Sequence, residues 1–422
     1  MKRFFRIPQN LPYLKDSLVS VGFRAGSALA VGKAIALAFG PAGTALFGQA
    51  MNLYTALANI PADAISRAMV REGAASQKSG DESGASISAM SASVLLLVIF
   101  IFQAILSALI SSYTDWFQPF QSADSGIVPL LLSFALVGVG SFSASYFLIW
   151  SKTNLQALSA TFMSLGGLLG VLVLWLFDAG FFACLMGFLV GQASGSFALL
   201  LIRSAEIPAF FRLEFWSFPH AKRMLVFAFA IASAGLVNQV SQYALVHWAL
   251  NAMGAEKVGL WMAMNRVADS LNIPILAVAN SILLPTLAGL ASNRKEIRNF
   301  LRPIFRQSLG LLVLGMLVLF VLYPLLLQIL FSADFVAERE QILWQLFGDF
   351  FRSSSCVFSV LMLALGHTRF YFWLETASAL FFLLVNQFLF SKYGFACLFI
   401  THAFRYLLYW LVIVLRYRTV FI

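Results

Sequence analysis

Apolar runs of about 20 residues recur along the whole chain, and short polar segments separate them. A helix needs about 20 apolar residues to cross the hydrocarbon core of a bilayer, whereas the strands of a transmembrane barrel would alternate in polarity. The pattern therefore predicts an all-α, polytopic membrane protein with about twelve transmembrane helices. The predicted spans are 17–39, 45–68, 87–110, 127–149, 157–177, 181–203, 222–247, 259–286, 304–327, 340–366, 370–390 and 396–415.

Composition supports this class and excludes several others. The chain has 60% hydrophobic and 11% charged residues and a mean hydropathy of +0.86, whereas a soluble domain has roughly 25% charged residues. No nucleotide-binding or hydrolase motif is present, and the few histidines and cysteines lack metal-ligand spacing. We therefore expect no metal, no cofactor and no catalytic site.

Lysine and arginine are concentrated in alternate loops. Segments on one side of the predicted spans hold 18 of the 28 basic residues, and the opposite loops hold three. Because cytoplasmic loops are enriched in lysine and arginine, both termini are predicted to be cytoplasmic, as in a multi-pass protein of the bacterial inner membrane. The net charge of +10 is then an orientation signal that also attracts anionic membrane lipids. It does not indicate a nucleic-acid partner.

An internal repeat divides the chain in two. Residues 50–61 (AMNLYTALANIP) and 263–274 (AMNRVADSLNIP) agree at six of twelve positions, at an offset of 213 residues. The repeat superimposes the second span on the eighth, which predicts an N-terminal lobe (1–203), a cytoplasmic linker (204–221) and a C-terminal lobe (222–422). In transporters of this kind the substrate site is a central cavity between such repeats.

Charged residues lie inside the predicted spans, where each costs about 2.5–3.5 kcal/mol on insertion scales and usually faces a cavity or a partner. The cations are Arg24, Lys33, Arg67, Arg266, Arg306, Arg352 and Arg405, and the acids are Asp63, Asp269, Asp349 and Glu375. Arg67 and Arg306 are close enough to a membrane surface to reach it. The excess of positive charge favours a phosphate or diphosphate ligand, which the forked guanidinium group of arginine fits.

Spacing separates these charges into two groups. Three acid–base pairs are three or four residues apart and could be intrahelical ion pairs. These pairs are Asp63 with Arg67, Arg266 with Asp269, and Asp349 with Arg352. Arg24, Lys33 and Arg405 have no such neighbour, so they are the stronger candidates for binding an anion. His402, three residues before Arg405, adds a group that can titrate.

The asparagines and prolines inside the predicted spans each allow two interpretations. Asn52 and Asn59 share a helix face with Asp63, and Asn272 shares one with Asp269; such faces either bind sugars or hold helices together. Pro61 and Pro274 occupy equivalent positions and favour kinks, which could be static or could belong to a gate. The glycines at 187, 191 and 195 indicate close helix packing.

A series of landmarks resembles a known family. They are Arg24 and Lys33, then FGPAG (39–43), VGLW (258–261), Asp269, LLPTL (283–287), WQLFGD (344–349) and Glu375. Their order resembles that of the O-antigen translocases and enterobacterial-common-antigen (lipid III) flippases in the multidrug/oligosaccharidyl-lipid/polysaccharide exporter superfamily. The resemblance implies two six-helix lobes and export of an undecaprenyl-pyrophosphate-linked glycan by alternating access, driven by a proton or ion gradient. It also implies a polysaccharide polymerase and a chain-length regulator as partners.

These observations lead to a set of expected site residues. We expect substrate contacts from Arg24, Lys33, Asn52, Asn59, Arg266, Asn272, Arg352 and Arg405. We expect ion coupling by Asp63, Asp269, Asp349 and Glu375. One alternative is a multidrug or cation antiporter of the same superfamily, although the first span holds only basic residues. A glycan polymerase or ligase is a weaker alternative, because the longest predicted outer loop, 111–126, has no lysine, arginine or histidine.

Overall fold

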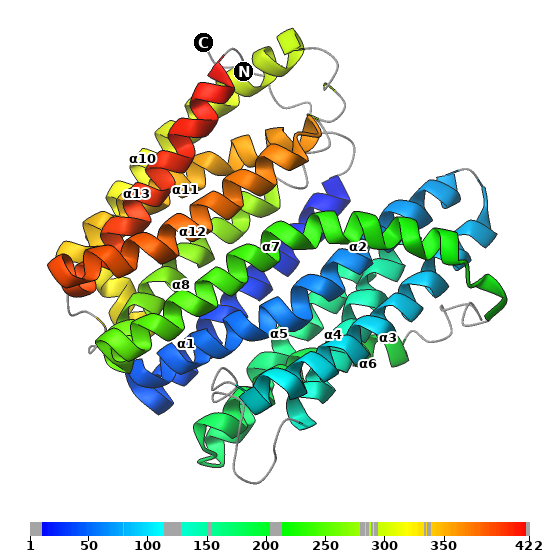
Figure 1. Cartoon of the computed structure of the whole chain (residues 1–422), viewed down its shortest axis with the longest axis horizontal. Coiled ribbons are helices and arrows are strands. Elements are labelled where there is room, and N and C mark those ends of the chain that lie inside the picture. Colours follow the sequence, from blue (N-terminus) through cyan, green and yellow to red (C-terminus); the bar gives the residue numbers. More distant parts are fainter. Residues whose placement is uncertain are drawn as a thin grey trace. The chain divides into compact units, whose positions relative to one another are not determined.

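A computed structural model describes residues 11–78, 80–113, 128–150, 153–202, 213–278, 294–332 and 339–418, and also residues 283, 287, 290 and 335. All the secondary-structure elements in these ranges are helices (Figure 1). The predicted all-α class is therefore confirmed. Three predicted features fall mainly outside the described residues, namely the outer loop 111–126, the first half of the linker and the centre of the LLPTL motif.

Six helical stretches in the described part are long and apolar enough to cross a membrane, or seven if a bent pair is counted. The two longest, Val21–Gly73 and Thr368–Arg416, contain 53 and 49 residues, and about 20 residues suffice for one crossing. Each of these two stretches therefore has the length for two crossings. The chain is a multi-pass membrane protein, and the number of twelve crossings stays a prediction.

The chain forms two compact units. Unit 1 comprises Met1–Ala34 and Phe47–Val240, and unit 2 comprises Ile35–Leu46 and Ser241–Ile422. The units thus divide the chain inside helix α7 (Phe218–Met253), downstream of the linker that the sequence predicted.

Unit 1 begins with the first part of α1 (Leu11–Tyr54), whose helix breaks at Gly40. Gly40 has φ 63° and ψ −163°, a backbone conformation that only glycine adopts readily. After α1 a single π-helical turn, η1 (Thr55–Asn59), leads into α2 (Ile60–Lys78). The predicted second span is therefore a composite of three helical segments.

Four more helices complete most of unit 1. They are α3 (Glu82–Tyr113), α4 (Val128–Ile149), α5 (Thr153–Leu176) and α6 (Phe181–Ile202). A short 3-10 turn, η4 (Leu213–Phe215), precedes α7. The buried core of this unit lies mainly between α2, α3, α4 and the start of α7.

Helices α5 and α6 pack backbone to backbone through glycine. A Cβ atom added at Gly170 would lie 2.0 Å from the carbonyl oxygen of Gly187, and one added at Gly191 would lie 2.3 Å from that of Gly166. Such contact is possible only without side chains, so the predicted packing role of the glycine series is confirmed.

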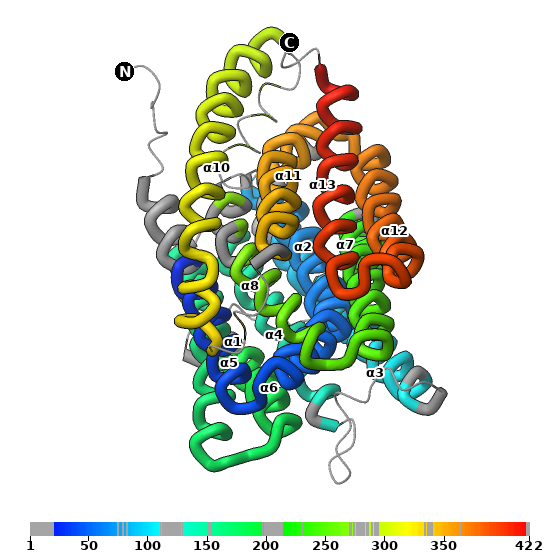
Figure 2. The backbone as a smooth tube through the Cα atoms, turned by 90° about the vertical axis from the view of Figure 1, so that its left-hand side faces the viewer, coloured from blue at the N-terminus to red at the C-terminus, as the bar shows by residue number. Residues whose placement is uncertain are grey.

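Unit 2 contains Ile35–Leu46 of α1, the rest of α7 and, in the described ranges, five long helices. They are α8 (Ala255–Val278), α10 (Arg294–Leu330), α11 (Arg339–Ala364), α12 (Thr368–Tyr393) and α13 (Cys397–Arg416). A 3-10 turn, η7 (Gly394–Ala396), joins the last two. Helices α11, α12 and α13 lie side by side, with α8 and α10 packed against α11 (Figure 2).

Two of the family-like motifs meet inside unit 2. A Cβ atom added at Gly259 of the VGLW motif would lie 1.8 Å from the carbonyl oxygen of Pro41 in the FGPAG motif. Trp261 of the same motif is buried against Phe382, with ring centroids 6.3 Å apart. These motifs therefore build the core of the unit rather than a ligand site.

Candidate functional site

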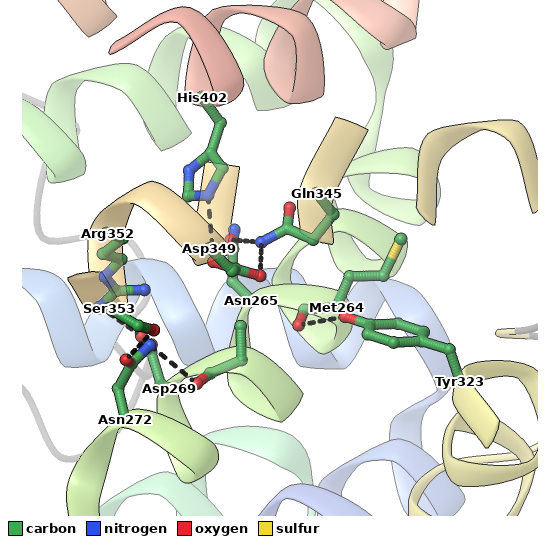
Figure 3. Close-up of polar contacts among 11 residues, drawn as sticks. Met264, Asn265, Asp269, Asn272, Tyr323, Gln345, Asp349, Arg352, Ser353 and His402 are labelled. Carbon is green, nitrogen blue, oxygen red and sulfur yellow. Dashed lines mark hydrogen bonds and ion pairs between the residues drawn. The ribbon is translucent and has the colours of Figure 1, made fainter. Parts of the chain in front are cut away.

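A polar ladder joins α8 to α11 in unit 2 (Figure 3). Three contacts make up its rungs. Gln345 donates to the Asn265 side chain at 3.2 Å, Arg352 pairs with Asp269 at 2.6 Å, and Ser353 donates to the Asn272 side chain at 2.6 Å. The residues on α8 recur every three or four positions, and those on α11 lie seven and eight positions apart from Gln345, so both sets share one helix face over about two turns. The ladder holds α8 and α11 in register.

A buried acid lies beside this ladder. The Asp349 carboxylate accepts a hydrogen bond from Gln345 at 3.0 Å and contacts Nε2 of His402, on α13, at 3.1 Å. Asp349 is 2% exposed and His402 is 4% exposed, so water does not screen this pair. An acid and an imidazole at this distance can share or exchange a proton.

The close approach of α13 depends on a glycine. A Cβ atom added at Gly348 would lie 2.1 Å from Cδ2 of His402 and 3.2 Å from Cα of Ala403. The predicted WQLFGD motif thus supplies Gln345, which bonds Asp349, then Gly348, which admits the imidazole, and finally the acid itself.

Very little open space adjoins the acid. A cavity of about 10 Å³ is lined in part by Asn272, Tyr323, Asp349 and Ser353, and that volume holds roughly one water molecule. Pockets for small-molecule ligands measure about 300–1,000 Å³. This part of unit 2 is therefore suited to holding a proton or locking helices together, and it is too small to enclose a sugar.

The other predicted site residues of unit 2 are Arg405, Glu375 and Arg266. Arg405 is 3% exposed; its Nε donates to the Ser378 hydroxyl at 2.8 Å, and its guanidinium lies over the rings of Phe382 and Tyr406 at 5.1 and 5.0 Å. Glu375 accepts a hydrogen bond from the Tyr409 hydroxyl at 2.8 Å. Arg266 is half-buried on α8, one turn before Asp269. Aromatic rings and hydroxyls thus surround the Arg405 guanidinium in the interior of the unit.

Unit 1 holds the other predicted residues. Asn52 accepts a hydrogen bond from Gln239 of α7 at 2.8 Å, and Asn59 donates to Thr55 at 3.5 Å. Arg24 and Lys33 both lie on exposed parts of α1. Within the described residues, Arg24 has no hydrogen-bond or ion-pair partner. A cation that faced hydrocarbon would be costly, so its exposure favours contact with water or an anion.

The expected intrahelical ion pairs have mixed outcomes. Asp63 and Arg67 do pair within α2, at 2.8 Å, with both side chains more than half exposed. Arg352, however, pairs with Asp269 of α8, and Asp349 contacts His402 of α13, so the intrahelical pair expected between Asp349 and Arg352 is wrong. The carboxylates instead join neighbouring helices.

The sequence predicted only part of this network. Gln345, Ser353, Ser378 and Tyr409 were not expected in it, although Gln345 and Ser353 share a helical face with Asp349 and Arg352. That spacing is a signal that could have found them. Nothing in the sequence pairs Ser378 with Arg405 or Tyr409 with Glu375, because both contacts depend on how α12 packs against α13.

Comparison with known proteins confirms the resemblance that the landmarks indicated. The chain is 25% identical over 364 residues to the lipid III flippase of Escherichia coli (strain K12), covering 83% of this chain and 84% of the relative. The lipid III flippase of Shigella flexneri matches with the same identity and coverage. No family model matches the chain.

Solved structures confirm the fold. A multidrug-resistance MATE transporter of the MOP superfamily, in an inward-facing conformation, aligns with a TM-score of 0.71 at 13% identity and covers 94% of each chain. The lipid II flippase MurJ, in an inward closed conformation, aligns with a TM-score of 0.70 at 16% identity, over 97% of this chain and 87% of MurJ. The chain therefore has the fold that these transporters share.

Proposed function

We propose that this protein is a flippase that carries an undecaprenyl-pyrophosphate-linked oligosaccharide from the cytoplasmic to the periplasmic leaflet of a bacterial inner membrane by alternating access. The similarity to lipid III flippases over most of both chains carries this proposal. The fold and the excess of embedded positive charge agree with it. A lipid III or O-antigen repeat unit is the expected cargo, and both termini are then cytoplasmic.

Arg24 is the cation that we assign to the diphosphate. Its side chain is exposed on α1 and has no partner within the described residues, so a phosphate can bind it without first displacing a carboxylate. Lys33 lies on the same helix and can add charge. Removing a hydrogen bond to a charged group costs about 1.5–3 kcal/mol, which corresponds to a loss of binding affinity of at least about tenfold.

Proton coupling is assigned to three carboxylates of unit 2. Asp349 with His402 is the first candidate, because the buried carboxylate lies 3.1 Å from an imidazole on another helix. Asp269 and Glu375 are further candidates, since each is joined to a residue of another helix. A change of protonation would then alter how α8, α11, α12 and α13 pack.

Complementation tests the proposed function. A strain that lacks its own lipid III flippase receives the wild-type gene or the variants Arg24→Ala and Arg24→Lys, and surface glycan is measured. We expect no export with Arg24→Ala and partial export with Arg24→Lys. Arg306→Ala is the matched control, because Arg306 is exposed on α10 and should leave export unchanged. Equal export by wild type and Arg24→Ala would exclude Arg24 as the diphosphate ligand.

The similarity to MATE transporters favours a second candidate function, export of organic cations. Such a site would need an embedded acid, and the first predicted span has only basic residues. The test is ethidium efflux from cells that lack their own multidrug exporters. Efflux that survives Arg24→Ala, together with failed complementation, would favour this alternative.

Glycan-assembly partners follow from the same proposal. A polysaccharide polymerase and a chain-length regulator would act on the exported units on the periplasmic side. Co-purification of tagged protein with these two enzymes from native membranes would test the association.

A further inference from the structure

Unit 1 contains an apolar groove at the level of the π-helical turn. Its volume is about 350 Å³, within the range of small-molecule pockets. Residues of η1, α2, α3 and α4 line it, among them Ala58, Ala62, Leu97, Gln103 and Gly138. Small residues on two walls leave the space open, and none of the described residues that line it is charged.

The two polar side chains in the groove are already satisfied. Pro61 has no N–H to donate to the carbonyl of Leu57, four residues before it, and the Gln103 side chain donates to that carbonyl instead. The Ser93 hydroxyl donates to the carbonyl of Ala89 at 3.0 Å. The groove therefore offers no free polar partner, and the chemistry that fits it is a hydrocarbon chain.

The groove is continuous with the lipid-facing side of α3. Leu97 lines the groove and is itself 57% exposed, and Val98, Ile101 and Phe102 on the same helix are 56%, 49% and 62% exposed. In a membrane protein such residues face the hydrocarbon of the bilayer. A lipid chain can therefore enter the groove from the side without meeting a polar barrier.

The same helical turn also carries polar contacts. Ala58 of η1 lines the groove, while Thr55 and Asn59 of η1 bond each other. One turn earlier, Asn52 bonds Gln239 of α7. One segment of the chain thus combines an apolar surface for a tail with amides of the kind that bind sugars.

We propose that this groove binds the polyprenyl tail of the cargo during transport. This inference rests on the proposed function, because only a lipid-linked cargo brings such a tail. A chain that leaves lipid for an apolar groove gains no hydrophobic free energy, since lipid is equally apolar, and it gains only close packing. Binding is therefore weak and reversible, as a tail that must follow its headgroup across the membrane requires.

Blocking the groove tests the proposal. A Cβ atom added at Gly138 meets nothing within 4 Å, so Gly138→Phe should fill the groove without displacing a helix. The matched control is Gly315→Phe on α10, where an added Cβ also meets nothing within 4 Å and the neighbouring Leu314 is 59% exposed. Transport is measured in proteoliposomes with undecaprenyl-pyrophosphate-linked trisaccharide and with the same headgroup on a short two-isoprene chain.

We expect Gly138→Phe to slow transport of the long-chain substrate by about tenfold, equivalent to 1.4 kcal/mol, and to leave the short-chain substrate and the control unchanged. Equal slowing of both substrates would overturn the proposal, as would no slowing of either. If wild type moves neither substrate, the proposed function fails.

A second measurement identifies what binds in the groove and does not depend on transport. A photoreactive residue at position 97 is irradiated in vesicles of phosphatidylethanolamine and phosphatidylglycerol that contain undecaprenyl pyrophosphate. Adducts are then identified by mass spectrometry. Prenyl adducts that Gly138→Phe removes support the proposal. Adducts with phospholipid acyl chains only would show a general lipid site and overturn it.

Discussion

Substituting Gly348 should disturb the contact between Asp349 and His402 without changing either residue. Gly348→Ala places a methyl group 2.1 Å from Cδ2 of His402, far inside van der Waals contact. The imidazole must therefore move, and its 3.1 Å contact with Asp349 is lost or lengthened. The added methyl also lies 3.2 Å from Cα of Ala403. That contact is present with or without the ring, so comparison with a His402→Ala background isolates the effect on the ring.

The expected change in the unfolding free energy is the difference between two opposing contributions. Loss of a hydrogen bond to a charged group costs about 1.5–3 kcal/mol, and replacing glycine by alanine inside a helix gains about 1 kcal/mol. In the wild-type background Gly348→Ala should therefore destabilise the protein by about 0.5–2 kcal/mol, the difference between the two terms. In a His402→Ala background the ring is absent, and the same substitution should be neutral or stabilising.

A double-mutant cycle measures this difference. Unfolding free energies are obtained by titrating mixed micelles with SDS, for wild type, Gly348→Ala, His402→Ala and the double variant. We expect a coupling energy of about 1.5–3 kcal/mol, the full value of the lost hydrogen bond. If the two single effects simply add, the imidazole does not lie against Gly348 and the assignment of Asp349 with His402 loses its basis.

Three further predictions concern other parts of the chain. Gly191→Ala should separate α5 from α6 and lower the unfolding free energy by about 1–3 kcal/mol, as overpacking does. Gly315→Ala, where the added methyl meets nothing within 4 Å, should instead raise the unfolding free energy by about 1 kcal/mol in the same SDS titration. Gln103→Leu should cost about 1 kcal/mol, because the Leu57 carbonyl loses a donor, and the cost should appear as faster hydrogen exchange around η1. Asp81 precedes α3 and accepts hydrogen bonds from the Ser83 hydroxyl and the backbone N–H at position 84, which lower the pKa of its carboxyl. The stabilisation from these hydrogen bonds is present above the unfolded pKa of about 3.9 and is lost as the pH falls through the lower folded value. The protection factors of amides at the start of α3, which are corrected for the pH dependence of intrinsic exchange, should therefore fall at low pH in wild type but not in Asp81→Asn.

The sequence was sufficient to predict the class of protein and its all-α fold. Hydropathy alone identified the helices, since no other regular structure satisfies its backbone inside a bilayer apart from a closed barrel. It did not predict the π-helical turn before Pro61. A carbonyl of that turn, at Leu57, accepts a hydrogen bond from Gln103 of another helix, and a local pattern cannot indicate a partner 46 positions away.

The sequence indicated the embedded charges but not the contacts that they make. The embedded charges were found because charge in a membrane is rare, yet their partners were assigned from spacing along one helix. Arg352 is three residues from Asp349, but it contacts Asp269 on α8. Residues three or four apart share a face, and a shared face brings both toward the same neighbouring helix. Side chains on a buried face therefore bond across to that neighbour whenever it is polar too.

Contacts across helices also rank the cations by how easily an anion can bind them. Arg352 pairs with Asp269 at 2.6 Å, so an anion that binds it must compete with a carboxylate already in place. Arg405 is 3% exposed, and an anion that reaches it must first open the packing of α12 against α13. Arg24 meets neither obstacle within the described residues, because it is exposed. We therefore propose that the diphosphate binds at α1, and that the charged groups of unit 2 bind the coupling proton rather than the cargo.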